Sequence, residues 1–185
     1  HHCLLTFLLV SGCRPGEALG LKWSDINLKT GVVSVQRTLK KKGDDFYFDP
    51  PKTSSGRRSI QLDPVMISRL TEHRRAQNEN RLKLGSGWKI HDIIFTDTWG
   101  MPLNLGSVRK HFKTLLEKAA IPSNVRLYDS RHTSATLAME ANIPIKEISE
   151  RLGHANTSIT MDIYSQVTSR LQQEASEKIS DALFG

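Results

Sequence analysis

Two arginines, a lysine, a histidine and a tyrosine stand at positions where a folded chain would leave them free for chemistry. Arg14 lies in a turn broken by glycine and proline, and Lys52 lies at the tip of an expected hairpin. Arg131 opens an expected helix, His154 follows the end of another, and Tyr164 comes ten residues later on a short helix. Guanidinium groups stay charged and offer paired donors that match phosphate oxygens. Taken singly, each residue is more often solvated, ion-paired or structural, so only the joint pattern carries an interpretation.

Several other kinds of reactive site are missing from the sequence. It contains no G-x-x-x-x-G-K phosphate loop, no G-x-G-x-x-G fingerprint and no G-x-S-x-G elbow. Its histidines, cysteines and carboxylates show no recognised metal-ligand spacing, and Cys3 and Cys13 form no disulfide framework. Nucleotide-driven, redox and zinc chemistry are therefore disfavoured, and we expect neither a cofactor nor a metal.

The composition is that of a globular chain with a positive excess. The chain has 185 residues, a formal net charge of +7 and 38% hydrophobic residues, which fits one domain or one domain with an appendage. No apolar stretch is long enough to cross a membrane and no signal peptide is visible, so we expect a cytoplasmic protein. The charge favours a polyanionic partner but is weak evidence alone. The chain opens with His1 and His2, native or left from a tag, and without Met, as a fragment of a longer protein would.

The elements that would position these residues are mostly helices. Leucines without polar alternation predict a buried helix over 3–11, and Pro15 begins a short second one. Asp63-Pro64 and Gly85 bound a longer helix. Further helices are expected over residues 105–119, 130–141, 144–152, 158–164 and 169–183.

A run of β-forming residues interrupts the helices. Residues 32–38, 46–48 and 58–62 predict a three-stranded antiparallel meander with Lys52 in its second turn. Residues 93–95 predict a short strand or a buried segment. The expected fold class is therefore mainly α with a small three-stranded antiparallel β-sheet.

Four stretches of the sequence carry a resemblance to a known family. They are residues 11–26 (SGCRPGEALGLKWSDI), 51–60 (PKTSSGRRSI), 129–136 (DSRHTSAT) and 151–165 (RLGHANTSITMDIYS). In order and spacing the chain resembles the catalytic domain of the tyrosine recombinases, the phage-integrase family, along essentially its whole length. The resemblance implies the DNA breaking-rejoining fold over residues 1–168, with 169–185 as a C-terminal tail helix.

The resemblance also implies a role for each residue that matches a family motif. Arg14 and Arg131 resemble the two catalytic arginines, Lys52 the hairpin lysine, and His154 the later His-or-Trp position. Tyr164 resembles the nucleophile, which attacks phosphorus and leaves a 3′-phosphotyrosyl enzyme and a free 5′-hydroxyl. Fixed cations would stabilise the transition state electrostatically, and Lys52 would protonate the leaving oxygen.

Three further residues have supporting roles in this reading. The family's helix motif usually reads His-x-x-Arg, but Tyr128 stands here in place of the histidine. A phenol can donate a hydrogen bond but cannot act as a base near neutral pH without a large pKa shift, so Tyr128 either has an altered role or only packs. Glu17 would orient a catalytic cation, or is simple helix charge, and His132 would buttress the site from outside or from the core.

Basic residues around the expected sheet are candidates for holding DNA. They are Arg37, Lys40, Lys41, Lys42, Arg57 and Arg58, with Arg109, Lys110 and Lys113 together on one helix. Phosphate contacts of this kind give salt-dependent, largely sequence-independent affinity. Some of these side chains are expected only to be solvated.

The tail differs from the body in its charge. Residues 169–185 hold two basic side chains against three acidic ones, whereas the body is basic. Leu171, Ala175, Ile179 and Leu183 recur every four residues as an apolar stripe. The stripe packs on its own domain or, as the resemblance implies, docks on a neighbouring protomer in a homo-oligomer, expected to be a tetramer on DNA.

The resemblance as a whole implies an integrase that cuts and rejoins double-stranded DNA at recombination sites of a mobile element in the bacterial cytosol or nucleoid. Directionality or host architectural proteins are further expected partners. Alternatives are a chromosome-dimer resolvase, a type IB topoisomerase-like enzyme, or a non-catalytic DNA-binding relic suggested by Tyr128.

Overall fold

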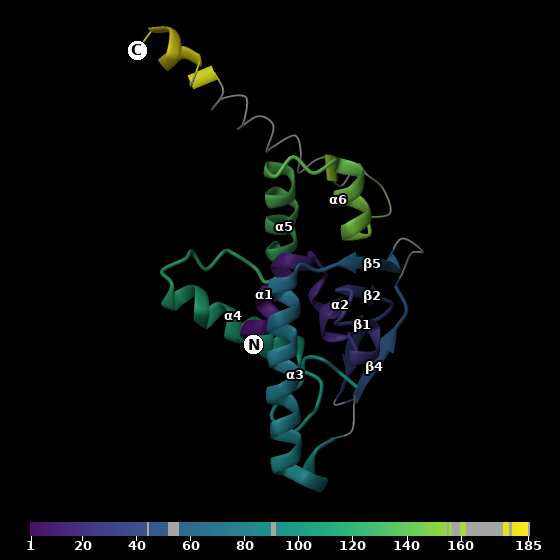
Figure 1. The fold of residues 1–185 in the computed structure, drawn as a ribbon. Coiled ribbons are helices and arrows are strands. Elements are labelled where there is room, and N and C mark those ends of the chain that lie inside the picture. The colour runs from purple at the N-terminus through teal and green to yellow at the C-terminus, as the bar shows by residue number, and fades with distance from the viewer. Residues whose placement is uncertain are drawn as a thin grey trace.

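The computed structural model describes residues 1–43, 45–51, 56–89, 92–154, 156, 160–161, 176–177 and 179–184, and it is mainly helical (Figure 1). The helices are α1 (His2–Ser11), α2 (Pro15–Leu19), α3 (Pro64–Leu84), α4 (Leu105–Lys118), α5 (Asp129–Glu140) and α6 (Ile145–Leu152), with 3₁₀ turns η1 (Trp23–Asp25) and η3 (Gly85–Gly87). The strands are β1 (Ile26–Asn27), β2 (Val32–Val35), β3 (Thr38–Lys42), β4 (Asp45–Asp49) and β5 (Arg58–Gln61). The predicted fold class is confirmed.

The order of the strands differs from the predicted meander. The three-stranded antiparallel sheet has the order β1-β2-β5, and β3 and β4 form a separate two-stranded hairpin. In the sheet, Val33 pairs with Ile60, and both side chains are buried. No residue of β4 is fully buried. Burial of an apolar face selects strand partners, so β5 joins β2 and the predicted middle strand turns back on β3 instead.

The ends of the helices follow the local signals in the sequence. The Asp63 carboxylate accepts hydrogen bonds from the backbone N–H groups of Val65 and Met66, which caps α3 as predicted. Gly85 follows the last residue of α3. Gly12 ends α1 in the left-handed region, with φ of 64°. The predicted segment 93–95 is buried, and Ile93 forms an isolated antiparallel bridge with Lys22.

The apolar interior consists of two clusters. The larger one gathers side chains from α1, α2, α3 and the sheet around Phe7, Leu8 and Ile60. The smaller one lies between α5 and α6, which stand side by side above α1 and β5 in Figure 1. The α5–α6 pair is thus a unit with its own core, and its position relative to the rest of the chain depends on contacts across the junction.

The end of the chain falls partly outside the described residues. These exclude most of the predicted 158–164 helix and residues 169–175 of the predicted tail helix. Residues 179–184 are helical and lie away from the other described elements (Figure 1). Within the described part of the chain, no helix combines the length and the apolar character needed to span a membrane.

Candidate active site

The first part of the site is a local structure that Arg14 and Glu17 build at the start of α2. Arg14 precedes the helix, and Pro15 at its first position is suited to that place because it lacks an N–H. The Glu17 carboxylate accepts from the Arg14 backbone N–H at 3.0 Å and from Arg14 Nη1 at 2.8 Å. The Arg14 side chain keeps 39% of its surface exposed. One face of this guanidinium is therefore fixed by Glu17 while the remainder stays accessible.

Arg58 holds the other oxygen of Glu17 from β5. Arg58 Nη2 donates to Glu17 Oε2 at 2.9 Å, and the two side chains are only 6% and 3% exposed. Burial raises the pKa of Glu17, but the hydrogen bonds and charges of Arg58 and Arg14 outweigh it, and the net pKa lies below the ordinary value. Glu17 is therefore a charged carboxylate between two arginines, which agrees with its expected orienting role.

Arg58 therefore differs from the DNA contact that the sequence suggested. Its guanidinium lies inside the molecule and also donates from Nε to the Arg151 carbonyl at 2.7 Å. The signal that could have placed it is strand alternation. Arg58 and the buried Ile60 are two residues apart on β5 and share a face, whereas Arg57, which precedes the strand, is exposed.

Arg131 brings the second guanidinium into the site from α5. Its Nη1 donates to the Gly12 carbonyl at 2.9 Å. Its Nη2 is buried and has no hydrogen-bond partner within the described part of the chain. Burial, followed by the charge of Arg14, lowers the pKa of Arg131 to about 10. Arg131 therefore remains charged at neutral pH, and its Nη2 can donate a hydrogen bond to a bound ligand.

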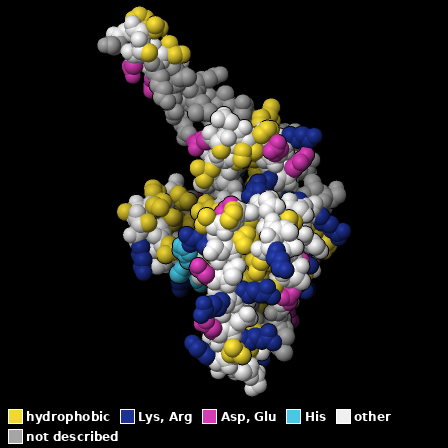
Figure 2. All heavy atoms as spheres, viewed as in Figure 1, with side chains coloured by type: hydrophobic (Ala, Val, Ile, Leu, Met, Phe, Trp, Pro, Cys, Tyr) yellow, Lys and Arg dark blue, Asp and Glu magenta, His cyan; other side chains and the backbone are white. Residues whose placement is uncertain are grey.

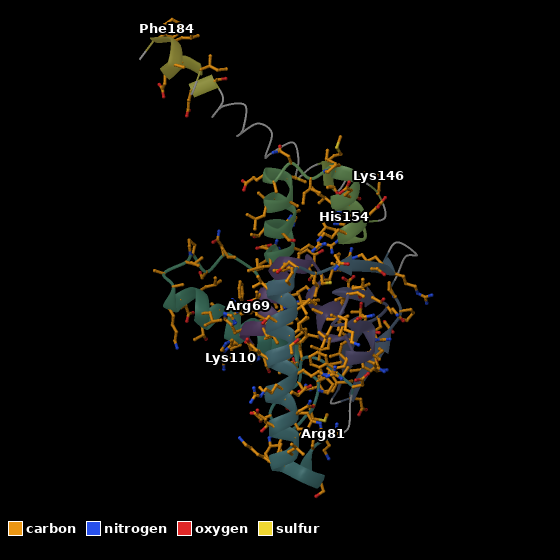
Figure 3. The ribbon with its side chains drawn as sticks, viewed as in Figure 1. Arg69, Arg81, Lys110, Lys146, His154 and Phe184 are labelled. Atoms are coloured by element: carbon orange, nitrogen blue, oxygen red, sulfur yellow. The ribbon has the colours of Figure 1, made fainter. Side chains whose placement is uncertain are left out.

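His154 follows α6 after Gly153, which ends that helix in the left-handed region. Its Nδ1 lies 2.8 Å from Thr160 Oγ1, and Figure 3 shows it at the end of α6 that faces β5. Burial, and then the charges of Arg131, Arg14, Arg58 and His132, lower the pKa of His154 to about 4. The ring is thus neutral at pH 7. When Nδ1 accepts the Thr160 hydroxyl proton, Nε2 carries the ring proton and is a donor.

Tyr128 and His132 lie at the rim of this group. Tyr128 directly precedes α5 and is 43% exposed. Burial alone would lower the pKa of the Arg14 guanidinium. The hydrogen bond and charge of Glu17, and then the Tyr128 phenol, outweigh this effect, so the net pKa of Arg14 is raised. His132 is exposed and meets Tyr128 edge-on, with ring centroids 6.2 Å apart. The expected core position of His132 is therefore wrong, while Tyr128 does contact a site cation.

The structure brings Arg14, Arg131 and His154 together with Glu17 and Tyr128, as the motif pattern predicted. Lys52 and Tyr164 lie outside the described residues. Sequence reasoning missed Arg151, which connects α6 to α1 and β5, because no charge pattern distinguishes it from a solvated arginine. Within the described residues, no three His, Cys, Asp or Glu side chains form a group that could hold a metal ion.

The other basic candidates lie on the surface of the molecule. Lys40, Lys41 and Lys42 (the hairpin lysines) occupy β3, where Lys40 pairs with Asp49 and the Lys41 Nζ lies 5.8 Å from the centroid of the Phe46 ring. Arg37 pairs with Asp25. On α4 the candidates Arg109, Lys110 and Lys113 are exposed. Figure 2 shows lysine and arginine side chains spread over the body.

Comparisons with known proteins identify the family of the chain. A family model described as "Phage integrase family" matches residues 1–170. A tyrosine recombinase XerC-like protein of Caldanaerobacter subterraneus is 35% identical, over 98% of this chain and 50% of its own length. The ICEBs1 integrase of Bacillus subtilis is 26% identical over 96% and 48%. The chain thus spans about half the length of these curated relatives.

Solved structures give the same fold. The Tn1549 transposon integrase in complex with transposon right-end DNA has a TM-score of 0.78 and 24% identity, over 95% of this chain and 58% of that one. The XerH site-specific recombinase bound to difH substrate has a TM-score of 0.63 and 25% identity, over 94% and 44%. The expected breaking-rejoining fold is confirmed.

Proposed function

Because the chain belongs to the phage integrase family, we propose that it is the catalytic domain of a site-specific tyrosine recombinase. In this proposal the protein cuts, exchanges and rejoins duplex DNA at recombination sites, and so integrates or excises a mobile element. It would act in the bacterial cytosol, on DNA of the nucleoid. Residues 1–168 supply the catalytic body and 169–185 the tail.

The observation that carries the proposal is Arg131 Nη2, a buried donor with no acceptor among the described residues. A buried donor without an acceptor costs about 1–3 kcal/mol, so a bound ligand that accepts from it would be stabilising. Arg14 is half accessible beside it, and His154 is neutral and offers a ring N–H. Two fixed cations and a neutral donor converging on one place suit the non-bridging oxygens of a phosphodiester.

The reaction assigned to this site is a direct exchange of ester bonds. The phenolate of Tyr164 forms a bond to phosphorus while the bond from phosphorus to the 5′ oxygen breaks. Lys52 gives the leaving 5′ oxygen its proton. The 3′-phosphotyrosine keeps the bond energy, so a 5′-hydroxyl can reverse the step without a nucleotide. Arg14 and Arg131 stabilise the charge that grows on the other phosphate oxygens.

The proposal is tested with a nicked suicide DNA that traps the covalent intermediate. The protein should form a DNA adduct that Tyr164→Phe abolishes, and Arg131→Ala should slow adduct formation by about 10²–10³-fold, as removal of one oxyanion donor does. Tyr47→Phe is the matched control, because this exposed tyrosine lies on the β3–β4 hairpin. An adduct that survives Tyr164→Phe, or none from the unmodified protein, contradicts the proposal, and the latter favours a DNA-binding relic.

The specific support for a non-catalytic DNA-binding relic is Tyr128, because this residue stands where the family motif has a histidine. In the recombinase reading, the phenol donates to a phosphate oxygen beside Arg14, and Tyr128→Phe should slow cleavage while Tyr128→His preserves it. Recombination between two sites, with retained sequence preference, distinguishes a recombinase from a type IB topoisomerase-like enzyme. Activity on a chromosomal dimer site instead of a mobile-element site would favour a resolvase.

We also propose that the tail carries the contact between protomers. Ile179, Leu183 and Phe184 are 60%, 69% and 85% exposed, and Figure 2 shows hydrophobic side chains on this separated helix. Leu9 and Leu137 line an apolar groove between α1, α5 and α6 that a second copy's tail could cover. Deletion of residues 169–185 should reduce assembly on paired DNA sites without abolishing binding to one site. Unchanged assembly would contradict this part.

A further inference from the structure

Arg151 stands at the junction of the two apolar clusters. It lies in the last turn of α6, three residues before His154. Its Nη1 donates to the Gln61 carbonyl of β5 at 3.0 Å, and its Nη2 donates to the Val10 carbonyl of α1 at 3.0 Å. One planar guanidinium thus joins α6 to two elements that belong to the other core. A fork of fixed donors is suited to this task in a way that a lysine is not.

The backbone of Arg151 is held as well. Its carbonyl accepts from Arg58 Nε at 2.7 Å, and the same Arg58 donates to Glu17, which holds Arg14. A continuous chain of hydrogen bonds therefore runs from the Arg14 guanidinium through Glu17 and Arg58 to the end of α6. The side chain and the carbonyl of Arg151 therefore both fix the distance from α6 to Arg14 and Glu17.

Apolar side chains also meet closely at this junction, but the cluster that α6 shares with α5 is small. A Cβ built on Gly12 would lie 2.5 Å from Leu152 Cδ2, the residue after Arg151. The α5–α6 pair has only a small core of its own around Ala135, Met139, Ile148 and Leu152. Hydrophobic contact is non-directional, so it holds α6 near α1 without fixing its orientation. Directional hydrogen bonds from Arg151 supply what packing does not.

We infer that Arg151 is a positioning residue that sets the place of His154 relative to Arg14 and Arg131. This inference rests on the proposed function for its effect on cleavage, but not for its effect on His154 itself. Without the Arg151 bridges, the end of α6 moves outward and His154 becomes more hydrated and farther from the site cations.

The test combines a substitution series with two independent measurements. Arg151→Met keeps the aliphatic stem and removes both bridges, and Arg151→Lys keeps the charge and can reach one carbonyl. Lys146→Ala is the matched control, because it removes a positive charge from an exposed position on the same helix (Figure 3). Thermal unfolding of each variant identifies any that fail to fold.

The first measurement is the titration of the His154 ring by NMR, assigned with a His154→Gln variant. The groups whose charges lower the pKa of this ring are Arg131, Arg14, Arg58 and His132. Arg151→Met should shift the titration upward, Arg151→Lys should shift it less, and Lys146→Ala should leave it unchanged. An unchanged titration in a folded Arg151→Met variant overturns the inference, whether or not the protein cleaves DNA.

The second measurement is the single-turnover rate of adduct formation on the suicide DNA. Arg151→Met should lower the rate at least tenfold with less than threefold change in DNA affinity, and Arg151→Lys should recover part of it. If Arg151 acts through His154, the Arg151→Met and His154→Gln double variant is no slower than His154→Gln alone. Additive losses overturn the inference. A shifted titration without any adduct from the unmodified protein refutes the proposed function and leaves the positioning role standing.

Discussion

Replacement of Glu17 by glutamine should destabilise the protein far more than an ordinary surface substitution does. The change keeps the size of the side chain but removes the charge that two arginines share. Arg58 is then a nearly buried cation without a counter-charge, and loss of one partner from such a pair costs about 3–5 kcal/mol. Glutamine can still accept one hydrogen bond and Arg14 is partly solvated, so we expect the lower end, about 3 kcal/mol. For a chain of this length that lowers Tm by about 6–12 °C.

The matched control is Glu79→Gln, which breaks an exposed pair with Arg75. Those side chains are 55% and 83% exposed, and such pairs contribute about 0–1 kcal/mol. Denaturant unfolding followed by circular dichroism measures both variants against the parent. A loss in Glu17→Gln of about 1 kcal/mol or less, indistinguishable from the control, would refute the argument that the buried charge network holds the site together.

The pH dependence of stability gives the same network a second test. The pKa of Glu17 is lower in the folded than in the unfolded chain, because Arg58 and Arg14 outweigh the effect of burial. Its stabilisation is therefore fully present above the ordinary pKa of about 4.3. It is lost as the pH falls through the lower folded pKa. Glu17→Gln should flatten that part of the stability profile, and an unchanged slope would contradict the assignment.

Three other outcomes follow from the described contacts. Gly12→Ala should cost about 1–3 kcal/mol, because φ is +64° and the new methyl meets Leu152, and a denaturation midpoint measures it. Asp63→Ala should lower the free energy of unfolding by about 1 kcal/mol through loss of the α3 cap. Replacement of an exposed Asp that caps no helix should leave this free energy unchanged. Replacement of the hairpin lysines by glutamine should reduce the slope of log affinity against log salt by about 0.9 for each lysine that contacts a phosphate. An unchanged slope would show that the hairpin lysines do not contact DNA phosphates.

The sequence predicted well the helices that the structure describes between residues 2 and 152, because their signals are local. Asp63 with Pro64 starts α3 and Gly85 follows it, so propensity and capping agree within one segment. The pairing of strands is not local. Phe46–Phe48 have β-forming side chains, but their partner depends on which strand offers a buried face, and that is decided by the whole core.

The candidate site was predictable to the extent that motifs carry it. The charges of Arg14 and Arg131 do act on His154, although one arginine lies in α5 and the other two residues lie beside the separate helices α2 and α6. Their surroundings were not predictable in the same way. Arg58 and Arg151 read as surface cations until the register of β5 and the docking of α6 are known, because an arginine's partner is set by tertiary structure.

Burial and the positive charge of this site together account for the protonation states within it. Among the described residues, three guanidiniums of Arg14, Arg58 and Arg131 face one carboxylate, Glu17. A further proton on His154 would add a fourth cation in a partly buried place, so the ring stays neutral down to about pH 4. Burial, and then the charge of Arg14, lower the pKa of Arg131, and among the described residues its Nη2 has no acceptor. Under the proposed function, a phosphodiester supplies an acceptor for this donor and negative charge to balance the three guanidiniums.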